Sequence, residues 1–215
     1  ENTPFNPRSS YGISKLTGCH LVKNYREAYK LHASNGILFN HESPRRGFEF
    51  VTRKITLAVA KIKKGSKEKL KLGNIKSKRD WGHAEDYVEG MRLMLQQDKP
   101  DDFVLATGET NSVKDFASMV LHKLGIEHDW VKTRAKQQQT DDYGNEINPN
   151  VYIDECYTKD HKLIITTDEK FKRPAEVDLL IGDSTKAREQ LGWKPKYDLD
   201  MLITDMLEWD LKRYG

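Results

Sequence analysis

The sequence has few of the residues that crosslink small secreted domains or bind zinc. Two of its 215 residues are cysteine, Cys19 and Cys156. Two isolated thiols provide neither a disulfide framework nor the spacing of a zinc site, so a reducing compartment is the default expectation. The chain also has no apolar run near the length of a membrane span and no signal peptide. These absences predict a cytoplasmic protein.

A glycine-rich phosphate loop between a strand and a helix is also missing from these residues. Such a loop is the usual contact with the phosphates of a dinucleotide. If the chain serves a nicotinamide cofactor, the half that holds the dinucleotide lies elsewhere. Residues 1–7 are predicted to form a polar loop that leads directly into a helix. The sequence is therefore expected to be a piece of a longer protein.

Charge of one sign does not dominate the chain. It has 36 basic and 33 acidic residues, a net charge of +3, and the two signs are mixed along the sequence. A run of lysines at 61–71 is the strongest basic cluster and could mark a nucleic-acid-binding protein. Aromatic residues do not interleave with these lysines, which argues against a stacking platform for bases. The run is more simply a solvated face.

The feature with the clearest chemical meaning is Tyr11-Gly12-Ile13-Ser14-Lys15. Residues four apart lie one above the other on a helix, and Pro7, Ser9 and Ser10 predict a helix entrance with a serine cap. An isolated phenol is a poor base at neutral pH, and a cation one helical turn away favours the phenolate. The pair could take a proton from an alcohol while a cofactor takes the hydride. Gly18, in the same helix, would permit a close backbone approach.

Apolar runs and amphipathic stretches alternate along the rest of the chain. Strands are predicted at residues 36–40, 70–72, 103–107, 128–131 and 163–167. Helices are predicted over residues 10–30, 51–62, 84–97, 112–124, 184–191 and 200–213. The side chains predicted to face the core include Tyr87, Met91, Met94, Leu95 and Trp209. This alternation predicts an α/β fold with at least part of a parallel sheet.

Three local patterns add to this description. Ser112 and Asp115 predict a capping box at a helix start. A charged loop is predicted from His41 to Gly47, because this segment is too polar to continue the preceding strand. Residues 133–161, rich in glutamine, asparagine and aspartate, are predicted to be loop or linker, and no site is assigned to them.

Five stretches carry a resemblance to a known family. They are Tyr11-Gly12-Ile13-Ser14-Lys15, Phe39-Asn40-His41-Glu42-Ser43-Pro44-Arg45-Arg46-Gly47, Arg79-Asp80-Trp81-Gly82-His83, Arg173-Pro174-Ala175-Glu176-Val177 and Leu191-Gly192-Trp193-Lys194-Pro195. Their order and spacing closely resemble the later part of the GDP-mannose 4,6-dehydratases, a family of extended short-chain dehydrogenases/reductases. The resemblance covers nearly the whole chain, and its second stretch is far more specific than Tyr-x-x-x-Lys.

The resemblance implies a fold and an activity. The fold would be α/β: an incomplete Rossmann-type parallel sheet in residues 1–45 and 74–108, left from an NADP-binding domain, and a smaller α/β nucleotide-sugar-binding domain in residues 46–73 and 109–215. The activity would be a lyase reaction of GDP-fucose biosynthesis, GDP-mannose to GDP-4-keto-6-deoxymannose, by internal hydride transfer through NADP and loss of water. In the family the phosphate loop, a catalytic threonine and a catalytic glutamate lie upstream, so these residues alone are expected to be inactive. A homo-oligomer, tetramer or dimer, is implied, with neither nucleic acid nor membrane as partner.

The resemblance also implies roles for individual residues. Tyr11 would be the catalytic base, with Lys15 as its electrostatic partner and a contact to the cofactor ribose. His41 and Arg46 match cofactor-contacting positions. The positions that match contacts to the nucleotide sugar are Asn40, Lys54, Arg79, Arg173 and Glu176. Arginine and lysine suit a diphosphate because they neutralise it, and arginine can do so with two parallel hydrogen bonds. No metal is implied.

Other interpretations stay open at this point. The chain could be a non-catalytic nucleotide-sugar-binding fragment, or part of another extended short-chain dehydrogenase/reductase that acts on a nucleotide sugar. Taken singly, His41 could be a structural histidine, Arg79 could form a surface ion pair with Asp80, and Arg173 could be a plain loop charge.

Overall fold

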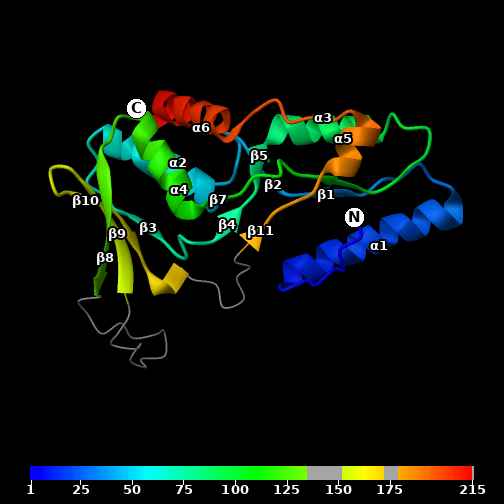
Figure 1. Ribbon diagram of the computed structural model, residues 1–215, viewed down its shortest axis with the longest axis horizontal. Helices are drawn as coiled ribbons and strands as arrows, with labels where there is room; N and C mark the ends of the chain where they lie inside the picture. Colours follow the sequence, from blue (N-terminus) through cyan, green and yellow to red (C-terminus); the bar gives the residue numbers. More distant parts are fainter. Residues whose placement is uncertain (135–151, 172–178, 215) are drawn as a thin grey trace. The chain divides into compact units, whose positions relative to one another are not determined.

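The computed structural model describes residues 1–134, 152–171 and 179–214 (Figure 1). The contacts divide the chain into two compact units, and each is described by itself. Unit 1 comprises residues 1–43, 78–111 and 175–202, and unit 2 comprises residues 44–77, 112–174 and 203–215. The first three boundaries lie close to those predicted, whereas residues 175–202, predicted for the nucleotide-sugar-binding domain, group with unit 1.

Short parallel strands form the sheet structure of unit 1. They are β1 (Gly36–Leu38), β2 (Asn40–Glu42), β4 (Lys78–Arg79), β5 (Trp81–His83), β6 (Phe103–Leu105) and β11 (Leu179–Leu180). β1 pairs with β6, β2 with β5 and β4 with β11, all in parallel, and β4 also neighbours β7 (Asn111–Ser112). The predicted parallel sheet is thereby confirmed. The prediction that the chain leaves the strand at His41 was wrong, because β2 pairs with β5 as far as Glu42.

The helices of unit 1 are α1 (Ser10–Tyr29), α3 (Ala84–Met94) and α5 (Thr185–Leu191). α3 packs on β6 and α5 through a core cluster of Tyr87, Met94, Phe103, Leu105, Ala187, Leu191 and Trp193. An added Cβ on Gly90 would lie 2.4 Å from the side chain of Leu105, so this glycine lets α3 approach β6 closely. The buried face of α3 therefore centres on Gly90. Met91 and Leu95 are 38% and 60% exposed, and the prediction that they face the core was wrong.

Unit 2 has a four-stranded mixed sheet. Its strands are β3 (Leu70–Leu72), β8 (His128–Arg134), β9 (Tyr152–Thr158) and β10 (Leu163–Thr167), in the order β3-β10-β9-β8. β10 is parallel to β3 and antiparallel to β9, and β9 is antiparallel to β8. The predicted loop over residues 133–161 was thus wrong at both ends, and its residues 135–151 lie outside the described part of the chain. β8 and β9 are mostly not buried, which is why they lack an apolar pattern.

The helices of unit 2 are α2 (Val51–Lys63), α4 (Val113–Lys123) and, from Ile203 onward, α6 (Leu199–Tyr214), together with the short 3-10 turn η1 (Glu169–Phe171). The predicted capping box of α4 is confirmed: Ser112 Oγ accepts from Asp115 N at 3.0 Å, and Asp115 Oδ2 accepts from Ser112 N at 3.1 Å. α6 buries Ile203 and Met206 as its pattern predicts. Trp209 is 45% exposed, contrary to prediction, because the next residue, Asp210, is the one that points inward.

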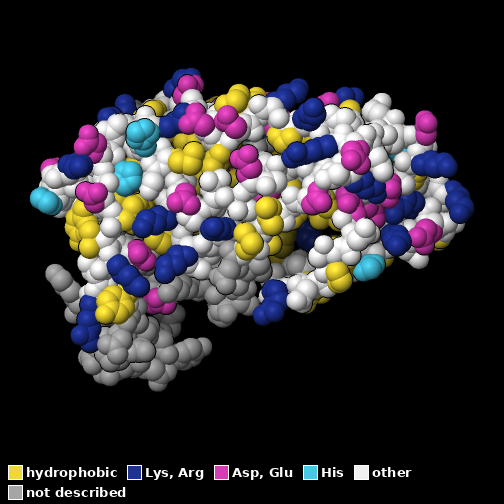
Figure 2. Space-filling view, in the orientation of Figure 1, with side chains coloured by type: hydrophobic (Ala, Val, Ile, Leu, Met, Phe, Trp, Pro, Cys, Tyr) yellow, Lys and Arg dark blue, Asp and Glu magenta, His cyan; other side chains and the backbone are white. Residues whose placement is uncertain are grey.

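The surface agrees with the mixed charge pattern of the sequence. On the face shown in Figure 2, basic and acidic side chains are interspersed among apolar and uncharged ones. This distribution gives no extended basic stripe on that face for a nucleic-acid backbone.

Candidate active site

α1 presents Tyr11 and Lys15 together at its N-terminal end. Ser9 caps the helix with an extended backbone (φ −151°, ψ 158°), and its Oγ accepts a 3.0 Å hydrogen bond from Gly12 N. The Nζ atom of Lys15 lies 5.4 Å from the centroid of the Tyr11 ring. Tyr11 is 70% exposed, so its hydroxyl is accessible to a ligand. The predicted arrangement of phenol and cation on one helix face is confirmed.

The rest of α1 lies on the surface of unit 1. The helix is described over its full length, and none of its residues is buried. An added Cβ on Gly18 would meet no atom of the described residues within 4 Å, so the close approach predicted there is not made. The rings of Tyr25 and Tyr29 lie 5.2 Å apart, and both side chains are exposed. Among the described residues, polar contacts rather than a buried apolar face connect α1 to the rest of unit 1.

Asn40 and His41 occupy β2, where they are half-buried opposite Trp81 and Gly82 of β5. The Nδ1 atom of His41 lies 2.8 Å from the carbonyl oxygen of Phe39. A carbonyl only accepts, so Nδ1 carries the proton and Nε2 is the ring atom left for a ligand. His41 thus has a structural hydrogen bond and a second nitrogen that can serve another partner.

Arg79 and Asp80 do not form the simple surface pair that the sequence allows. The guanidinium Nη1 of Arg79 donates to the carbonyl oxygen of Lys78 at 2.9 Å. Asp80 is fully buried and accepts from Thr107 N at 2.9 Å, Thr107 Oγ1 at 2.7 Å and Gly108 N at 2.9 Å. This carboxylate fixes the residues that follow β6 to the start of β5. It therefore holds the backbone that carries Arg79, a role that the sequence did not reveal.

Unit 1 also has a buried tyrosine, Tyr87, whose environment is opposite to that of the exposed Tyr11. Tyr87 is fully buried, its ring lies 5.1 Å from that of His41, and its hydroxyl has no hydrogen-bond partner among the described residues. An added Cβ on Gly82 would lie 2.6 Å from the Tyr87 ring, so glycine is required beside it. Burial, with the negative charges of Asp80 and Asp86, raises the pKa of Tyr87. It is therefore unsuited to act as a base at neutral pH.

Arg46 and Lys54 lie in unit 2, at the start of α2. The guanidinium carbon of Arg46 lies 3.6 Å from the centroid of the Phe50 ring, and Phe50 is the N-cap residue of α2. Lys54 N donates to Phe50 O at 2.9 Å, and Lys54 Nζ lies 5.7 Å from the centroid of the Phe171 ring. Both cations are thus held beside aromatic rings at one end of a helix.

A pocket of about 340 Å³ in unit 2 includes Lys54 in its lining. Its other lining residues include Phe48, Leu57, Lys61, Ser66, Lys69 and Lys71. Four of the ten lining residues are lysines and one, Glu68, is acidic, so the net charge around the pocket is positive and suits an anion. The lysine run that reads as a solvated face in the sequence thus contributes to a concave surface beside Lys54.

Unit 2 contains a buried ion pair that the sequence did not predict. Arg53 Nη1 donates to Asp210 Oδ2 at 2.6 Å, and both side chains are almost fully buried. Burial raises the pKa of Asp210, and Arg53 and Thr56 oppose that effect. The Arg53 guanidinium carbon also lies 5.4 Å from the ring of Phe48. The pair joins α6 to α2 next to the segment that carries Arg46.

Two of the predicted site residues lie outside the described part of the chain, and the others are divided between the two units. Arg173 and Glu176 lie outside the described residues. Tyr11, Lys15, Asn40, His41 and Arg79 belong to unit 1, and Arg46 and Lys54 belong to unit 2. Among the described residues, no group of three or more histidine, cysteine, aspartate or glutamate side chains could hold a metal ion. No described helix is long and apolar enough to cross a membrane.

Comparisons with known proteins agree in naming one family. The family model described as GDP-mannose 4,6 dehydratase matches residues 1–206. The chain is 49% identical over 212 residues to GDP-mannose 4,6 dehydratase of Homo sapiens, covering 99% of this chain and 53% of that protein. It is 47% identical over 211 residues to GDP-mannose 4,6-dehydratase of Sinorhizobium fredii, covering 98% and 56%. The chain thus spans about half the length of the curated relatives it matches.

Solved structures of low sequence identity share the fold. RMD from Pseudomonas aeruginosa, complexed with NADPH, superposes with a TM-score of 0.75 at 17% identity, over 99% of this chain and 59% of that one. UDP-glucuronic acid 4-epimerase from Bacillus cereus, in complex with UDP-glucuronic acid and NAD, gives a TM-score of 0.73 at 17% identity, over 99% and 55%. At this level of identity the likeness shows the fold alone.

Proposed function

This chain belongs to the GDP-mannose 4,6 dehydratase family, and we propose that the full protein converts GDP-mannose to GDP-4-keto-6-deoxymannose. The reaction is an internal redox dehydration: hydride leaves C4 of the hexose and returns at C6, and the C6 hydroxyl leaves as water. The observation that carries the proposal is the exposed Tyr11 on a capped helix, with the Lys15 ammonium 5.4 Å from its ring.

Tyr11 acts as the base toward the C4 hydroxyl. Its position at the exposed end of α1 lets the phenolic oxygen reach a bound sugar, from which it accepts the proton, and the Lys15 ammonium lies 5.4 Å from the centroid of its ring. Proton transfer of this kind is worth about 10²–10⁴ in rate. Tyr87, the other tyrosine discussed in unit 1, cannot substitute because burial disfavours its charged form.

The cofactor is proposed to be NADP, which supplies the reversible hydride acceptor when bound. The residues present fit such a group. Lys15 offers a donor to ribose hydroxyls, and His41 keeps Nε2 for a ligand because Nδ1 already bonds Phe39 O. Arg46 offers a planar guanidinium, which suits a phosphate. Two structural relatives, RMD from Pseudomonas aeruginosa and the 4-epimerase from Bacillus cereus, were solved with NADPH and NAD respectively.

Residues that match the family's nucleotide-sugar contacts are proposed to bind the substrate, and each unit is considered by itself. Lys54 lines a pocket that three further lysines make positive, which suits the diphosphate. Asn40 and Arg79 supply an amide and a guanidinium from unit 1, and Asp80 fixes the backbone beside Arg79. Arg173 and Glu176 complete the set by resemblance to the family. These assignments rest on residue type and family position.

Three further properties belong to the proposal. The full protein is expected to be a homo-oligomer, either a tetramer or a dimer, and to work in the cytoplasm. The 215 residues alone are expected to be inactive, because the family's phosphate loop and the catalytic threonine and glutamate lie outside them.

Another nucleotide-sugar reaction is the second candidate, because the structural relatives include 4-epimerases. An epimerase would return hydride to C4 and release no water. The test is to incubate the full protein with GDP-mannose and NADP⁺ and identify the product by mass and NMR. A keto sugar lighter by one water supports the dehydratase. A C4 epimer of unchanged mass would favour the second candidate, and binding without turnover would indicate a nucleotide-sugar-binding protein.

A further inference from the structure

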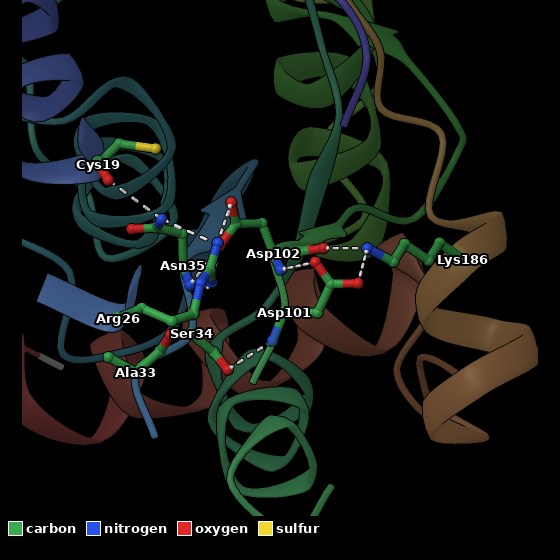
Figure 3. A network of polar contacts seen from close by, with 8 residues as sticks. All are labelled: Cys19, Arg26, Ala33, Ser34, Asn35, Asp101, Asp102 and Lys186. Carbon is green, nitrogen blue, oxygen red and sulfur yellow. Dashed lines mark hydrogen bonds and ion pairs between the residues drawn. The ribbon is translucent and has the colours of Figure 1, made fainter. Parts of the chain in front are cut away.

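A polar cluster in unit 1 connects α1 to the edge of the β1–β6 pair (Figure 3). Arg26, in the last turns of α1, donates to both carboxylate oxygens of Asp102: Nη1 to Oδ1 at 2.7 Å and Nη2 to Oδ2 at 3.2 Å. Asp102 immediately precedes β6. The two side chains are 14% and 23% exposed, so the pair is largely shielded from water. A two-bonded pair of this kind fixes direction as well as distance.

Asn35 gives Asp102 a second connection to α1. Both Asn35 N and Asn35 Nδ2 donate to Asp102 Oδ1, at 3.1 and 3.0 Å, and Nδ2 also donates to the carbonyl oxygen of Cys19 at 3.2 Å. Cys19 and Arg26 are seven residues apart, about two helical turns, and so lie on the same face of α1. Asp102 is therefore the common acceptor for two attachments of one helix.

Other contacts of α1 restrain it less. The helix has no buried residue along its whole described length. Phe5 meets the ring of His20 edge-on at 6.2 Å between centroids, but Phe5 is itself 50% exposed. Among the described residues, the Asp102 cluster is the polar attachment that joins α1 to the start of β6.

We propose that Asp102 is a positioning residue for Tyr11. Tyr11 lies fifteen residues before Arg26, about 22 Å along the helix at 1.5 Å per residue. A tilt of about 5° at the Arg26 end would move the Tyr11 end by about 2 Å by this geometry. Misplacement of a reacting group by about 1 Å can cost about 10²-fold in rate. The inference rests on the proposed role of Tyr11 as base.

The neighbouring residue provides a matched control. Asp101 Oδ2 accepts from Lys186 Nζ at 2.6 Å, and Lys186 also donates to Asp102 O at 2.8 Å (Figure 3). Lys186 lies on α5, so the ion pair of Asp101 serves α5. Asp101 Oδ1 also accepts from Asp102 N at 2.8 Å, a bond that the amide oxygen of an asparagine can keep. Asp101→Asn and Asp102→Asn remove the same charge from adjacent positions but release different helices.

The experiment compares Asp102→Asn, Arg26→Met and the double variant with Asp101→Asn, all in the full protein. Asp102→Asn and Arg26→Met are expected to lower kcat for GDP-mannose by about tenfold or more with unchanged KM. The loss in the double variant is expected to be smaller than the sum of the two single losses, because Asp102→Asn and Arg26→Met share the Arg26–Asp102 connection. The pH of half-maximal kcat should not move, since Lys15 travels with Tyr11 on the same helix. Asp101→Asn should leave kcat unchanged.

Amide hydrogen exchange of α1 is a second readout that does not depend on turnover. Exchange in residues 15–29 is expected to accelerate about tenfold in Asp102→Asn and to stay unchanged in Asp101→Asn. Arg26→Met, on the helix surface, covers the case in which Asp102→Asn fails to fold. The positioning proposal is overturned if neither Asp102→Asn nor Arg26→Met changes the amide exchange of α1. It is also overturned if Asp101→Asn lowers kcat as much as Asp102→Asn does. Faster α1 exchange together with a parent protein that does not turn over GDP-mannose would instead overturn the proposed function.

Discussion

Unit 1 has the shielded ion pair Arg26–Asp102, and unit 2 has the buried ion pair Arg53–Asp210. The two pairs differ in the hydrogen bonds that the carboxylate accepts. Asp102 is partly shielded and receives hydrogen bonds from Arg26 and from the backbone and side chain of Asn35. Asp210 is fully buried; Arg53 reaches its Oδ2, and its Oδ1 has no hydrogen-bond partner among the described residues within 3.5 Å. The two pairs have similar shortest distances, 2.7 and 2.6 Å.

The surroundings of each carboxylate, and not the distance to its cation, set the direction in which its pKa is shifted. Burial by itself would raise the pKa of Asp102, but the hydrogen bonds from Arg26 and Asn35 outweigh burial and lower it. For Asp210 burial prevails over Arg53 and Thr56, and the pKa is raised. The unit 1 pair therefore stabilises an attachment, whereas the unit 2 pair is tolerated at a cost in desolvation.

The largest effect is expected from breaking the unit 2 pair. Arg53→Met leaves the Asp210 carboxylate buried without its counterion, and this should lower the unfolding free energy of unit 2 by about 3–5 kcal/mol. Replacing both partners, Arg53→Met with Asp210→Leu, should restore most of the loss. Native-state amide exchange of α2 and α4 measures both. A double variant that is as unstable as Arg53→Met would contradict the view that desolvation limits this pair.

A smaller loss is expected from breaking the unit 1 pair. Asp102→Asn removes charge-assisted hydrogen bonds from Arg26, worth about 1.5–3 kcal/mol when shielded and less for a pair that water partly reaches. The loss should appear in the exchange of α1 and of residues around β1, and not in α2. An equal loss in both units would show that the two pairs are not independent.

Acidification should affect the two units in opposite directions. The lowered pKa of Asp102 gives stability that is present above the ordinary carboxyl pKa of about 3.9 and is lost as pH falls through the lowered native value. The raised pKa of Asp210 has the opposite sign: the native state gains stability as pH falls from that raised value toward about 3.9. The check is the difference in amide exchange between the parent and each Asp→Asn variant as a function of pH. Differences that change in the same direction in both units would refute the assigned pKa directions.

No resolvable effect is expected from an exposed pair of similar length. Arg92 Nη2 lies 2.7 Å from Glu89 Oε1 on α3, but the two side chains are 57% and 39% exposed. Water screens such a pair, so Glu89→Gln should leave the urea midpoint of the protein unchanged. A clear shift of the urea midpoint would mean that the distance between the charged groups alone determines how much these pairs stabilise the protein.

Local patterns in the sequence predicted the elements that depend on neighbouring residues. The capping box of Ser112 and Asp115, the apolar spacing of α2 and the Tyr11–Lys15 register all follow from residues three or four apart. Apolar periodicity did not reveal that Arg53 and Asp210 point inward, because a helix pattern assigns charged residues to the outside. Met91 was misplaced for a related reason: Gly90, which has no side chain, marks the buried face of α3.

Parts of the site depend on contacts between residues far apart in the chain. Asp102 reaches Arg26 across 76 residues, and Asp80 reaches Gly108 across 28. No local pattern predicts such partners, so the roles of both carboxylates became visible only in the fold. The family motif identified Tyr11, Lys15, His41 and Arg79, but not the residues that hold them.

The measurement that tests the central claim most directly is the turnover of GDP-mannose by Tyr11→Phe beside Tyr25→Phe in the full protein with NADP⁺. Both substitutions remove one exposed hydroxyl from α1, and only Tyr11 has the Lys15 ammonium over its ring. Loss of the base should reduce kcat by about 10²–10⁴-fold in Tyr11→Phe, with GDP-mannose affinity retained, while Tyr25→Phe keeps the parent rate. A Tyr11→Phe protein that forms the keto sugar at the parent rate would contradict the account.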